Sequence, residues 1–230
     1  MNDKLIYHQE KPSKEIQRAI DWINSGSTVL ELGCHTGVLA AEIKKKSCVV
    51  TGVEVNQQAL KIAEPHLSKS FCRDLNDFTF WNELNNEKFD AITWIHVLEH
   101  LFNPEETLIK SAGLLKEDGV MIIALPNISN ARQRFDMLFG KFEYEETGVM
   151  DKTHLHFFNY FTAPKLIESC GLKITEYYSA WQTNPTRQFL RHLPVLHNLT
   201  RVMSESKPPL FPGYAPNLTD VTMLFKCVRK

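Results

Sequence analysis

Apolar segments and amphipathic segments alternate along the first half of the chain. Stretches of apolar and β-branched residues predict buried strands at 28–32, 49–55, 70–72, 89–94 and 120–125. Between these strands, apolar residues recur every three or four positions, which is typical of helices that cover a sheet. This alternation of strand and helix predicts an α/β fold built on a parallel sheet.

Side chains that can cap a helix mark where the helices begin. Ser13 and Asn56 each precede an amphipathic segment, and Asn103 is followed by Pro104 and two glutamates. A capping oxygen, a proline at the first helical position and acids in the first turn all stabilise a helix start. The apolar stripe of the helix that follows Asn103 is expected to comprise Leu108, Ile109, Ala112 and Leu115.

The regular alternation stops after the fifth predicted strand. Residues 128–158 are rich in Phe, Arg and acidic residues, and they predict a helix and a long inserted loop whose aromatic residues are mostly core. A further helix is predicted to begin at Thr162, followed by strands at 172–179 and 221–228. The proline-rich residues 181–217 predict a second insertion, between the sixth and seventh strands.

Composition excludes several classes of protein. With 230 residues, 43% of them hydrophobic and 23% charged, the chain has the proportions of one ordinary globular domain. Twenty-six basic and 27 acidic side chains give a net charge of -1, so no strong field favours a nucleic-acid or membrane partner. The apolar run 120–125 is far shorter than the roughly 20 residues of a membrane-spanning helix.

Cysteine content and the N-terminus predict a compartment. The five cysteines are an odd number without a C-x-x-C pair, which argues against a disulfide framework or a cysteine-rich zinc site. The first residues have no apolar stretch of the kind found in a signal peptide. We therefore expect the reducing cytoplasm.

The predicted strand ends carry residues that suit an adenosine-containing ligand. The first strand is followed by a turn with glycines at Gly33 and Gly37, a G-x-x-x-G spacing that differs from the G-x-G-x-x-G of dinucleotide sites. Glu54 ends the second strand, where its carboxylate can accept hydrogen bonds from both ribose hydroxyls. Asp74 ends the third, placed to accept from an adenine amine. Ligands of open α/β sheets bind at these carboxyl ends.

In these segments the chain resembles the class I S-adenosylmethionine-dependent methyltransferases, and in particular a bacterial group that acts on small metabolites, quinone precursors or sugars. The matching segments are VLELGCHTGVLA (29–40), VTGVEVN (50–56), FDAITWIHVLEHLFNPEETL (89–108), LLKEDGVMIIALPN (114–127) and MDKTHLHFFNYFTAPKLIESCGLKI (150–174). The resemblance implies a Rossmann-like, doubly wound sheet of seven strands with the last strand antiparallel. It also implies S-adenosylmethionine as the cofactor.

The resemblance implies a role for each matching residue. Glu31 and the backbone of the glycine turn hold the methionine end of the cofactor, Glu54 binds the ribose, and later residues border the adenine and line the pocket. The implied cofactor-binding residues are Glu31, Gly33, Cys34, His35, Gly37, Glu54, Asp74, Leu75, Trp94 and His96. His35 stands where the family usually has glycine, so its side chain must touch the cofactor or point away from it.

Transfer of a methyl group to a hydroxyl also requires a group that accepts a proton, and histidine is the usual one. We expect His154 to be this base, with Asp151 orienting its imidazole; the alternative is that His154 only anchors the loop. His96, Glu99 and His100 have a spacing that on a helix would present three metal ligands, although we expect no metal.

These expectations describe one methyltransferase domain, residues 1–230, with a cofactor-binding core at 27–127 and acceptor-covering insertions at 128–160 and 181–217. The expected reaction is O-methylation of a small molecule or a saccharide hydroxyl. The expected partner is therefore a small-molecule acceptor, with no nucleic acid and no membrane span, and the oligomeric state is left open. Two alternatives are a non-catalytic binding module of the same fold and a nicotinamide-dependent oxidoreductase.

Overall fold

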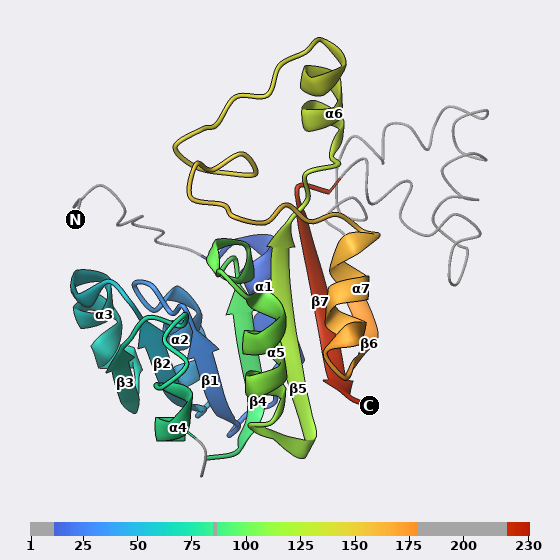
Figure 1. Ribbon diagram of the computed structural model, residues 1–230. Helices are drawn as coiled ribbons and strands as arrows, with labels where there is room; N and C mark the ends of the chain where they lie inside the picture. The colour runs from blue at the N-terminus through green and yellow to red at the C-terminus, as the bar shows by residue number, and fades with distance from the viewer. Residues whose placement is uncertain (1–11, 85–86, 179–219) are drawn as a thin grey trace, which may run out of the picture.

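A computed structural model describes residues 12–84, 87–178 and 220–230 (Figure 1). Within them, seven strands form one sheet in the order β3-β2-β1-β4-β5-β7-β6. The strands are β1 (Thr28–Leu32), β2 (Val49–Glu54), β3 (Lys69–Cys72), β4 (Phe89–Ile95), β5 (Leu115–Pro126), β6 (Leu172–Tyr178) and β7 (Thr222–Arg229). The helices are α1 (Lys14–Trp22), α2 (Val38–Lys44), α3 (Gln57–Ala63), α4 (Trp81–Leu84), α5 (Pro104–Ala112), α6 (Ala131–Leu138) and α7 (Thr162–Ser169), with short 3-10 helices η2 (Glu64–His66) and η3 (Leu98–His100).

The sheet is mixed in the way that was expected. β1 pairs in parallel with β2 and β4, β2 with β3, and β4 with β5. β7 runs antiparallel to both of its neighbours, β5 and β6. The predicted seven-stranded doubly wound sheet with an antiparallel last strand is therefore confirmed. The carboxyl ends of the parallel strands share one edge, the upper edge in Figure 1.

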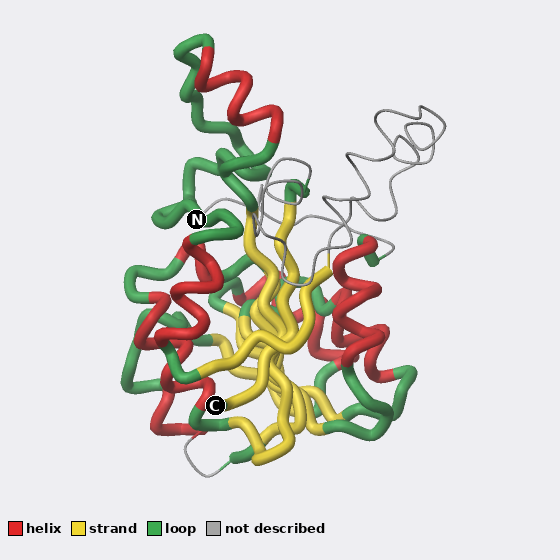
Figure 2. Tube along the Cα trace, turned by 90° about the vertical axis from the view of Figure 1, so that its right-hand side faces the viewer, coloured by secondary structure: helices red, strands yellow, loops and turns green. Residues whose placement is uncertain are grey.

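Helices cover both faces of the sheet, because successive strand residues point to opposite faces. Val29 packs with α1 and α2 on one face, whereas Leu30 and Leu32 pack with α4, α5 and α7 on the other. Seen edge-on, the strands lie between two layers of helix (Figure 2). Burial on both faces explains why these strands are continuous apolar runs.

The predicted caps form. The side chains of Ser13, Asn56 and Asn103 each accept a hydrogen bond from a backbone N–H in the first turn of their helix. Each cap satisfies a donor that would otherwise have no partner inside the helix. These contacts set the residues at which α1, α3 and α5 begin.

The boundary between α5 and β5 differs from the prediction. β5 begins at Leu115 rather than at residue 120, and Leu115 is buried in the sheet instead of extending the helix stripe. Ile109 is 51% exposed, so it does not belong to the buried face of α5. The polar residues 116–118 hide the start of the strand in the sequence, and its pairing with β4 shifts register between Phe89 and Ala91.

The insertion after β5 projects beyond the carboxyl edge of the sheet, with α6 at its tip (Figures 1 and 2). A helix followed by a long loop was expected, but the aromatic residues of its tip are not core. Phe135, Phe139, Phe142 and Tyr144 are each more than half exposed. The second predicted insertion, 181–217, lies outside the described residues. Within the described chain, no helix is both long enough and apolar enough to span a membrane.

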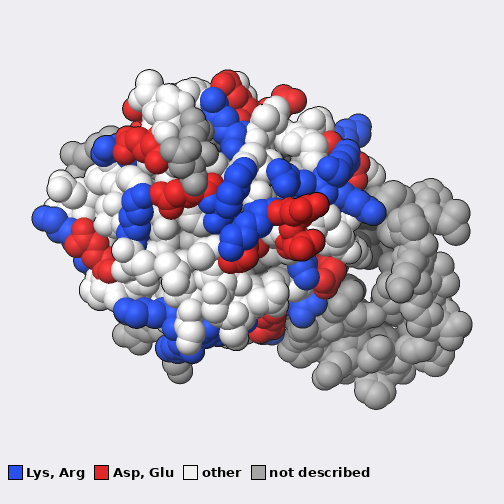
Figure 3. Space-filling model, turned by 90° about the horizontal axis from the view of Figure 1, so that it is seen from below, with Lys and Arg blue, Asp and Glu red and all other residues white. Residues whose placement is uncertain are grey.

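The opposite end of the sheet carries charges of both signs. Viewed from that side, Lys and Arg side chains lie among Asp and Glu side chains (Figure 3). At the amino end of β4, for example, Lys116 Nζ lies 2.8 Å from a carboxylate oxygen of Asp90. Charges of opposite sign are therefore interspersed on this face, and the main cavity lies at the other end.

Candidate functional site

A cavity of about 950 Å³ opens at the carboxyl edge of the parallel strands. Its wall is formed by the turn after β1, the ends of β2, β3 and β4, and a loop from the insertion after β5. Most of the residues predicted to act in the site lie in this wall: Glu31, Gly33, Cys34, His35, Glu54, Asp74, Leu75, His96, Asp151 and His154.

Gly33 makes the turn after β1 tight. Its φ is +72°, a left-handed conformation that favours glycine, and its N–H donates to the carbonyl of Val53 at 2.8 Å. A Cβ at this position would overlap Cγ2 of Val97. The turn therefore requires glycine for its conformation and for its space, and the backbone itself lines the cavity.

Two backbone N–H groups hold the carboxylate of Glu54. The N–H of His35 donates to one oxygen at 2.9 Å, and that of Asn56 donates to the other at 2.9 Å. The side chain is nearly buried, so these bonds compensate for the water it has lost. His35 reaches this position with a φ of +46°, a left-handed conformation that glycine adopts at lower cost. The imidazole of His35 lines the cavity.

Glu31 brings a second buried carboxyl group to the same wall. Burial raises the pKa of Glu31 to about 8, with the N–H of Ala40 opposing this shift and the charge of Glu54 adding to it. Its Oε2 atom is buried and has no hydrogen-bond partner among the described residues. A buried oxygen without a partner costs free energy, which a donor or a cation in the cavity would recover.

The turn after β3 supplies the far end of the cavity. Asp74 is exposed, and its Oδ1 accepts hydrogen bonds from the backbone and side-chain nitrogens of Asn76, at 2.9 and 3.0 Å. Leu75 is buried next to it and provides an apolar surface. This end of the cavity therefore has an acidic rim beside an apolar wall.

Two residues predicted to bind the cofactor lie outside the cavity wall. Trp94 is fully buried, packs against Trp81 and donates its Nε1–H to Ser111 at 3.3 Å. Strand alternation turns Trp94 into the core, so the prediction that it lines the pocket is wrong. At Gly37 a Cβ would lie 2.9 Å from Ala63, so this glycine allows α2 to approach α3.

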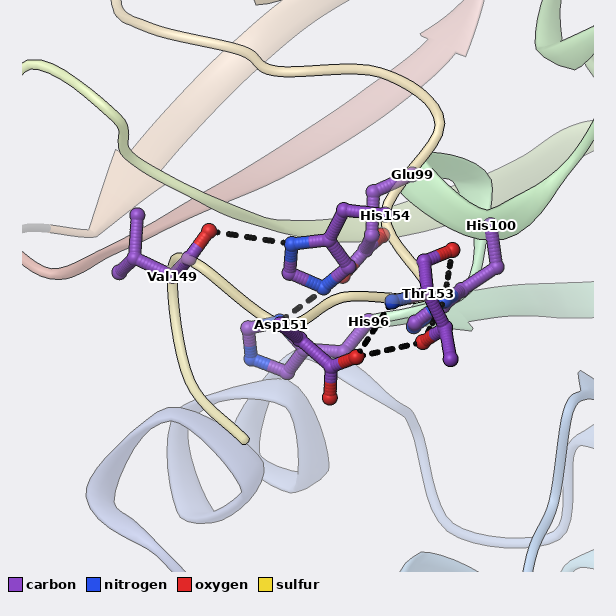
Figure 4. A network of polar contacts seen from close by, with 7 residues as sticks. All are labelled: His96, Glu99, His100, Val149, Asp151, Thr153 and His154. Atoms are coloured by element: carbon purple, nitrogen blue, oxygen red, sulfur yellow. Dashed lines mark hydrogen bonds and ion pairs between the residues drawn. The ribbon is translucent and has the colours of Figure 1, made fainter. Parts of the chain in front are cut away.

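The part of the cavity between the end of β4 and the inserted loop holds a network of polar side chains (Figure 4). His154 is almost completely buried, and its Nδ1 lies 3.1 Å from the carbonyl oxygen of Val149. Because a carbonyl only accepts, Nδ1 carries the proton and Nε2 is left bare. Burial lowers the pKa of His154, although the charge of Glu99 opposes this shift.

Asp151 does not hold the imidazole of His154 as expected. Its Oδ1 accepts from the backbone N–H of Thr153 at 2.8 Å and from the Thr153 hydroxyl at 2.6 Å. Thr153 also contacts Nδ1 of His100, at 3.1 Å from its hydroxyl. Thr153, two residues away, thus takes up the carboxylate that was expected to orient His154. Through the contact of Thr153 with His100, the same turn docks the loop on η3.

Glu99 is the residue around which this end of the cavity is organised. It is 0% exposed, and within the described chain neither of its carboxylate oxygens has a hydrogen-bond partner. Its Oε1 lies 3.4 Å from Nδ1 of His96 and 3.9 Å from Nε2 of His154. Its backbone carbonyl accepts from the N–H groups of Leu155 and His156, at 2.8 and 3.1 Å.

The structure groups a different set of possible metal ligands from the set that the sequence suggests. Glu99 and His100 lie on a single 3-10 turn, so the helical face that would have presented both beside His96 does not form. Instead, ligand-type atoms of Glu99, His100 and His154 lie within 4.8 Å of one another. The sequence could not indicate this grouping, since His154 is more than 50 residues away along the chain.

The sequence matches one family over most of its length. Residues 5–177 match a family described as "Methyltransferase domain". The chain belongs to this methyltransferase family. The expected cofactor, S-adenosylmethionine, and the expected class I fold are thereby confirmed, and nothing in the match supports the oxidoreductase alternative.

Curated relatives of this methyltransferase share part of its length. The chain is 33% identical over 109 residues to the ubiquinone biosynthesis O-methyltransferase of Glaesserella parasuis, covering 44% of this chain and 46% of that one. It is 29% identical over 126 residues to the protein of the same name from Azoarcus sp., covering 51% and 54%. The chain therefore spans about half the length of the curated relatives it matches.

Solved structures show the same fold at low identity. An S-adenosylmethionine-dependent methyltransferase from Archaeoglobus fulgidus superposes with a TM-score of 0.61 at 16% identity, over 94% of this chain and 91% of that one. Magnesium protoporphyrin IX methyltransferase from Synechocystis, solved with bound S-adenosylhomocysteine, gives 0.60 at 12% identity, over 94% and 82%. These likenesses concern the fold alone.

Proposed function

We propose that this methyltransferase transfers the methyl group of S-adenosylmethionine to a hydroxyl oxygen of a small molecule or saccharide. The observation that carries this proposal is the continuity of one cavity, which joins the glycine turn and two buried acids to a cluster of histidines. One end suits a cofactor and the other suits a group that must lose a proton. The O-methyltransferase names of the relatives support the same type of reaction.

The residues of the first end fit the cofactor. Glu31 offers an unpaired buried oxygen to the cationic methionine end, and the glycine turn leaves room for that end against its backbone. Glu54, held by two N–H groups, retains lone pairs for the ribose hydroxyls. Asp74 and Leu75 border the adenine.

The second end handles the acceptor. The bound cofactor supplies a methyl group already activated on a positively charged sulfur. The protein therefore has to align the acceptor oxygen, exclude water and take up one proton. The histidines around Glu99 are the groups for this proton, and the sequence predicts His154 among them.

The proposal also covers the domain organisation, the location and the partners of the protein. We propose a single domain over 1–230, with 128–160 and 181–217 covering a small-molecule acceptor. All five cysteines lie in the described part of the chain and are free thiols, which supports a reducing, cytoplasmic location. The proposal includes neither a nucleic-acid partner nor a resident metal.

Titration calorimetry with S-adenosylhomocysteine, and with NADH as a negative control, tests the cofactor end. We expect binding of the thioether and none of NADH, and a loss of affinity in Glu54→Gln that is absent in Glu64→Gln, an exposed acid outside the cavity. Transfer of labelled methyl groups to a panel of phenols, sugars and amines then tests the acceptor end. Binding without transfer to any of these acceptors would favour the non-catalytic module, and transfer to amines alone would contradict the proposed O-methylation.

A further inference from the structure

His96 adopts a backbone conformation that few residues tolerate. Its φ is +56°, and its N–H donates to the carbonyl of Ala124 at 3.1 Å at the point where β4 ends. Glycine or asparagine would occupy this left-handed position at lower cost. Strain of this kind at the wall of a cavity points to a use for the side chain.

The side chain of His96 lies between a buried carboxylate and the cavity, as a general base requires. Its Nδ1 faces the buried Glu99 carboxylate at 3.4 Å, and contacts of this length in an empty site commonly tighten when substrate binds. A carboxylate at Nδ1 favours the tautomer with the proton on that nitrogen and leaves Nε2 bare. The imidazole is 41% exposed and lines the cavity, so Nε2 is accessible to an acceptor.

The neighbouring histidines are less well placed. The side chain of His154 is only 5% exposed, and its bare Nε2 faces the same Glu99 oxygen at 3.9 Å. His100 uses its Nδ1 in contacts with the hydroxyl and carbonyl oxygens of Thr153. All three histidines line the cavity, but of the three only His96 is exposed and has a carboxylate oxygen 3.4 Å from its Nδ1. His154 packs against Glu99, and His100 joins η3 to the loop through Thr153 (Figure 4).

We infer that His96 is the general base of the reaction and that Glu99 is its positioning residue, an assignment that rests on the proposed O-methylation. The acceptor oxygen forms a bond to the methyl carbon while the carbon–sulfur bond breaks with its electron pair going to sulfur. The hydroxyl proton moves to Nε2 of His96, and the charge on the ring is balanced by Glu99. The partly exposed imidazole then returns the proton to water.

Two variants of His96 test this inference. His96→Asn keeps a residue that tolerates the left-handed backbone and an N–H directed at Glu99, but it removes the base. We expect turnover to fall by about 10²-fold or more, the usual contribution of a general base, with S-adenosylhomocysteine affinity within twofold of wild type. His96→Gly should lose the same activity and recover part of it when imidazole is added. His66→Asn, a histidine outside the cavity, serves as the matched control.

Glu99→Gln distinguishes a role of Glu99 in positioning His96 from a role in stabilising the fold. It keeps the size of the side chain and removes the charge that balances the imidazolium. We expect kcat to fall more than tenfold with little change in KM, melting temperature or cofactor affinity, whereas a structural role would lower the melting temperature.

Three results would overturn the inference. His96→Asn with wild-type turnover, beside an inactive His154→Gln, would make His154 the base. Loss of wild-type activity with a chelator and its return with a divalent ion would show that the cluster holds a metal. A wild-type chain that binds S-adenosylhomocysteine but methylates no hydroxyl would contradict the proposed function itself. An active wild type with an equally active His96→Asn would contradict only the role of His96.

Discussion

The two ends of the cavity are built in different ways. The cofactor end consists of backbone and of acids at the ends of consecutive strands, such as Glu31 and Glu54. The acceptor end joins His96 and Glu99, after β4, to His154 on a loop from a later insertion. The first is built from the ends of consecutive strands, whereas the second depends on how a distant loop docks. We therefore expect substitutions at one end to leave the other largely unaffected.

The largest effect is expected for Gly33→Ala. The Cβ of alanine would overlap Val97, which lies two residues before Glu99 in the chain. This substitution at the cofactor end can therefore also disturb the acceptor end. We expect a loss of about 2–4 kcal/mol in the free energy of unfolding, from strain and overpacking, and loss of cofactor binding. Thermal unfolding and calorimetry measure both quantities.

Gly26→Ala is the matched control for that substitution. Gly26 has a similar φ of +76°, but no heavy atom lies within 4 Å of the position that a Cβ would take there. It should lose only the conformational contribution, about 1 kcal/mol. Equal losses in the two variants would show that space at Gly33 is unimportant.

Cofactor affinity should depend on pH through Glu31. With a pKa near 8, the free carboxyl is mostly protonated at pH 6, and the ammonium group of the ligand's amino-acid end binds the ionised form better. Affinity for S-adenosylhomocysteine should therefore rise with pH up to about 8, by at most about tenfold per unit, with release of a proton on binding. Calorimetry in buffers of different ionisation enthalpy measures that proton.

Glu31→Gln should bind more weakly and abolish this pH dependence. The same variant should be more stable than wild type at pH 8, because the raised pKa means that ionisation disfavours the folded state as pH rises from about 4.5 through 8. A pH dependence that persists in Glu31→Gln would assign it to another group.

Thr153→Val tests whether the acceptor end depends on the docking of the inserted loop. It removes the hydroxyl that joins Asp151 to His100 and so loosens the docked loop. We expect turnover to fall about tenfold while cofactor affinity stays within twofold, since a hydrogen bond to a charged group such as the Asp151 carboxylate is worth about 1.5 kcal/mol. A comparable loss of cofactor affinity would contradict the independence of the two ends.

The smallest effect is expected for His35→Gly. Glycine adopts the φ of +46° without strain, which offsets its greater freedom in the unfolded chain. We expect the free energy of unfolding to change by less than about 1 kcal/mol, and cofactor affinity by less than about threefold, because the N–H that holds Glu54 is kept. A larger loss of affinity would show that the imidazole contacts the cofactor.

Strand alternation and turn chemistry account for what could be predicted. Continuous apolar runs specified β1, β2 and β4, and capping residues specified where α1, α3 and α5 begin. The prediction failed where a local pattern was ambiguous. Polar residues at 116–118 concealed the start of β5, and Trp94 was assigned to the cavity because an end-of-strand position does not reveal which face a side chain occupies.

By itself, the sequence determined the sheet, its helices and the acids at the cofactor end, because these depend on periodicity, caps and residues adjacent in the chain. Only the tertiary structure decided that Glu99 lies between His96 and His154 and that Asp151 bonds to Thr153. The physical reason is that a buried carboxylate acquires its neighbours from whichever segments pack over it. Here those segments are the end of β4 and a loop some 50 residues later, and no local pattern encodes their contact.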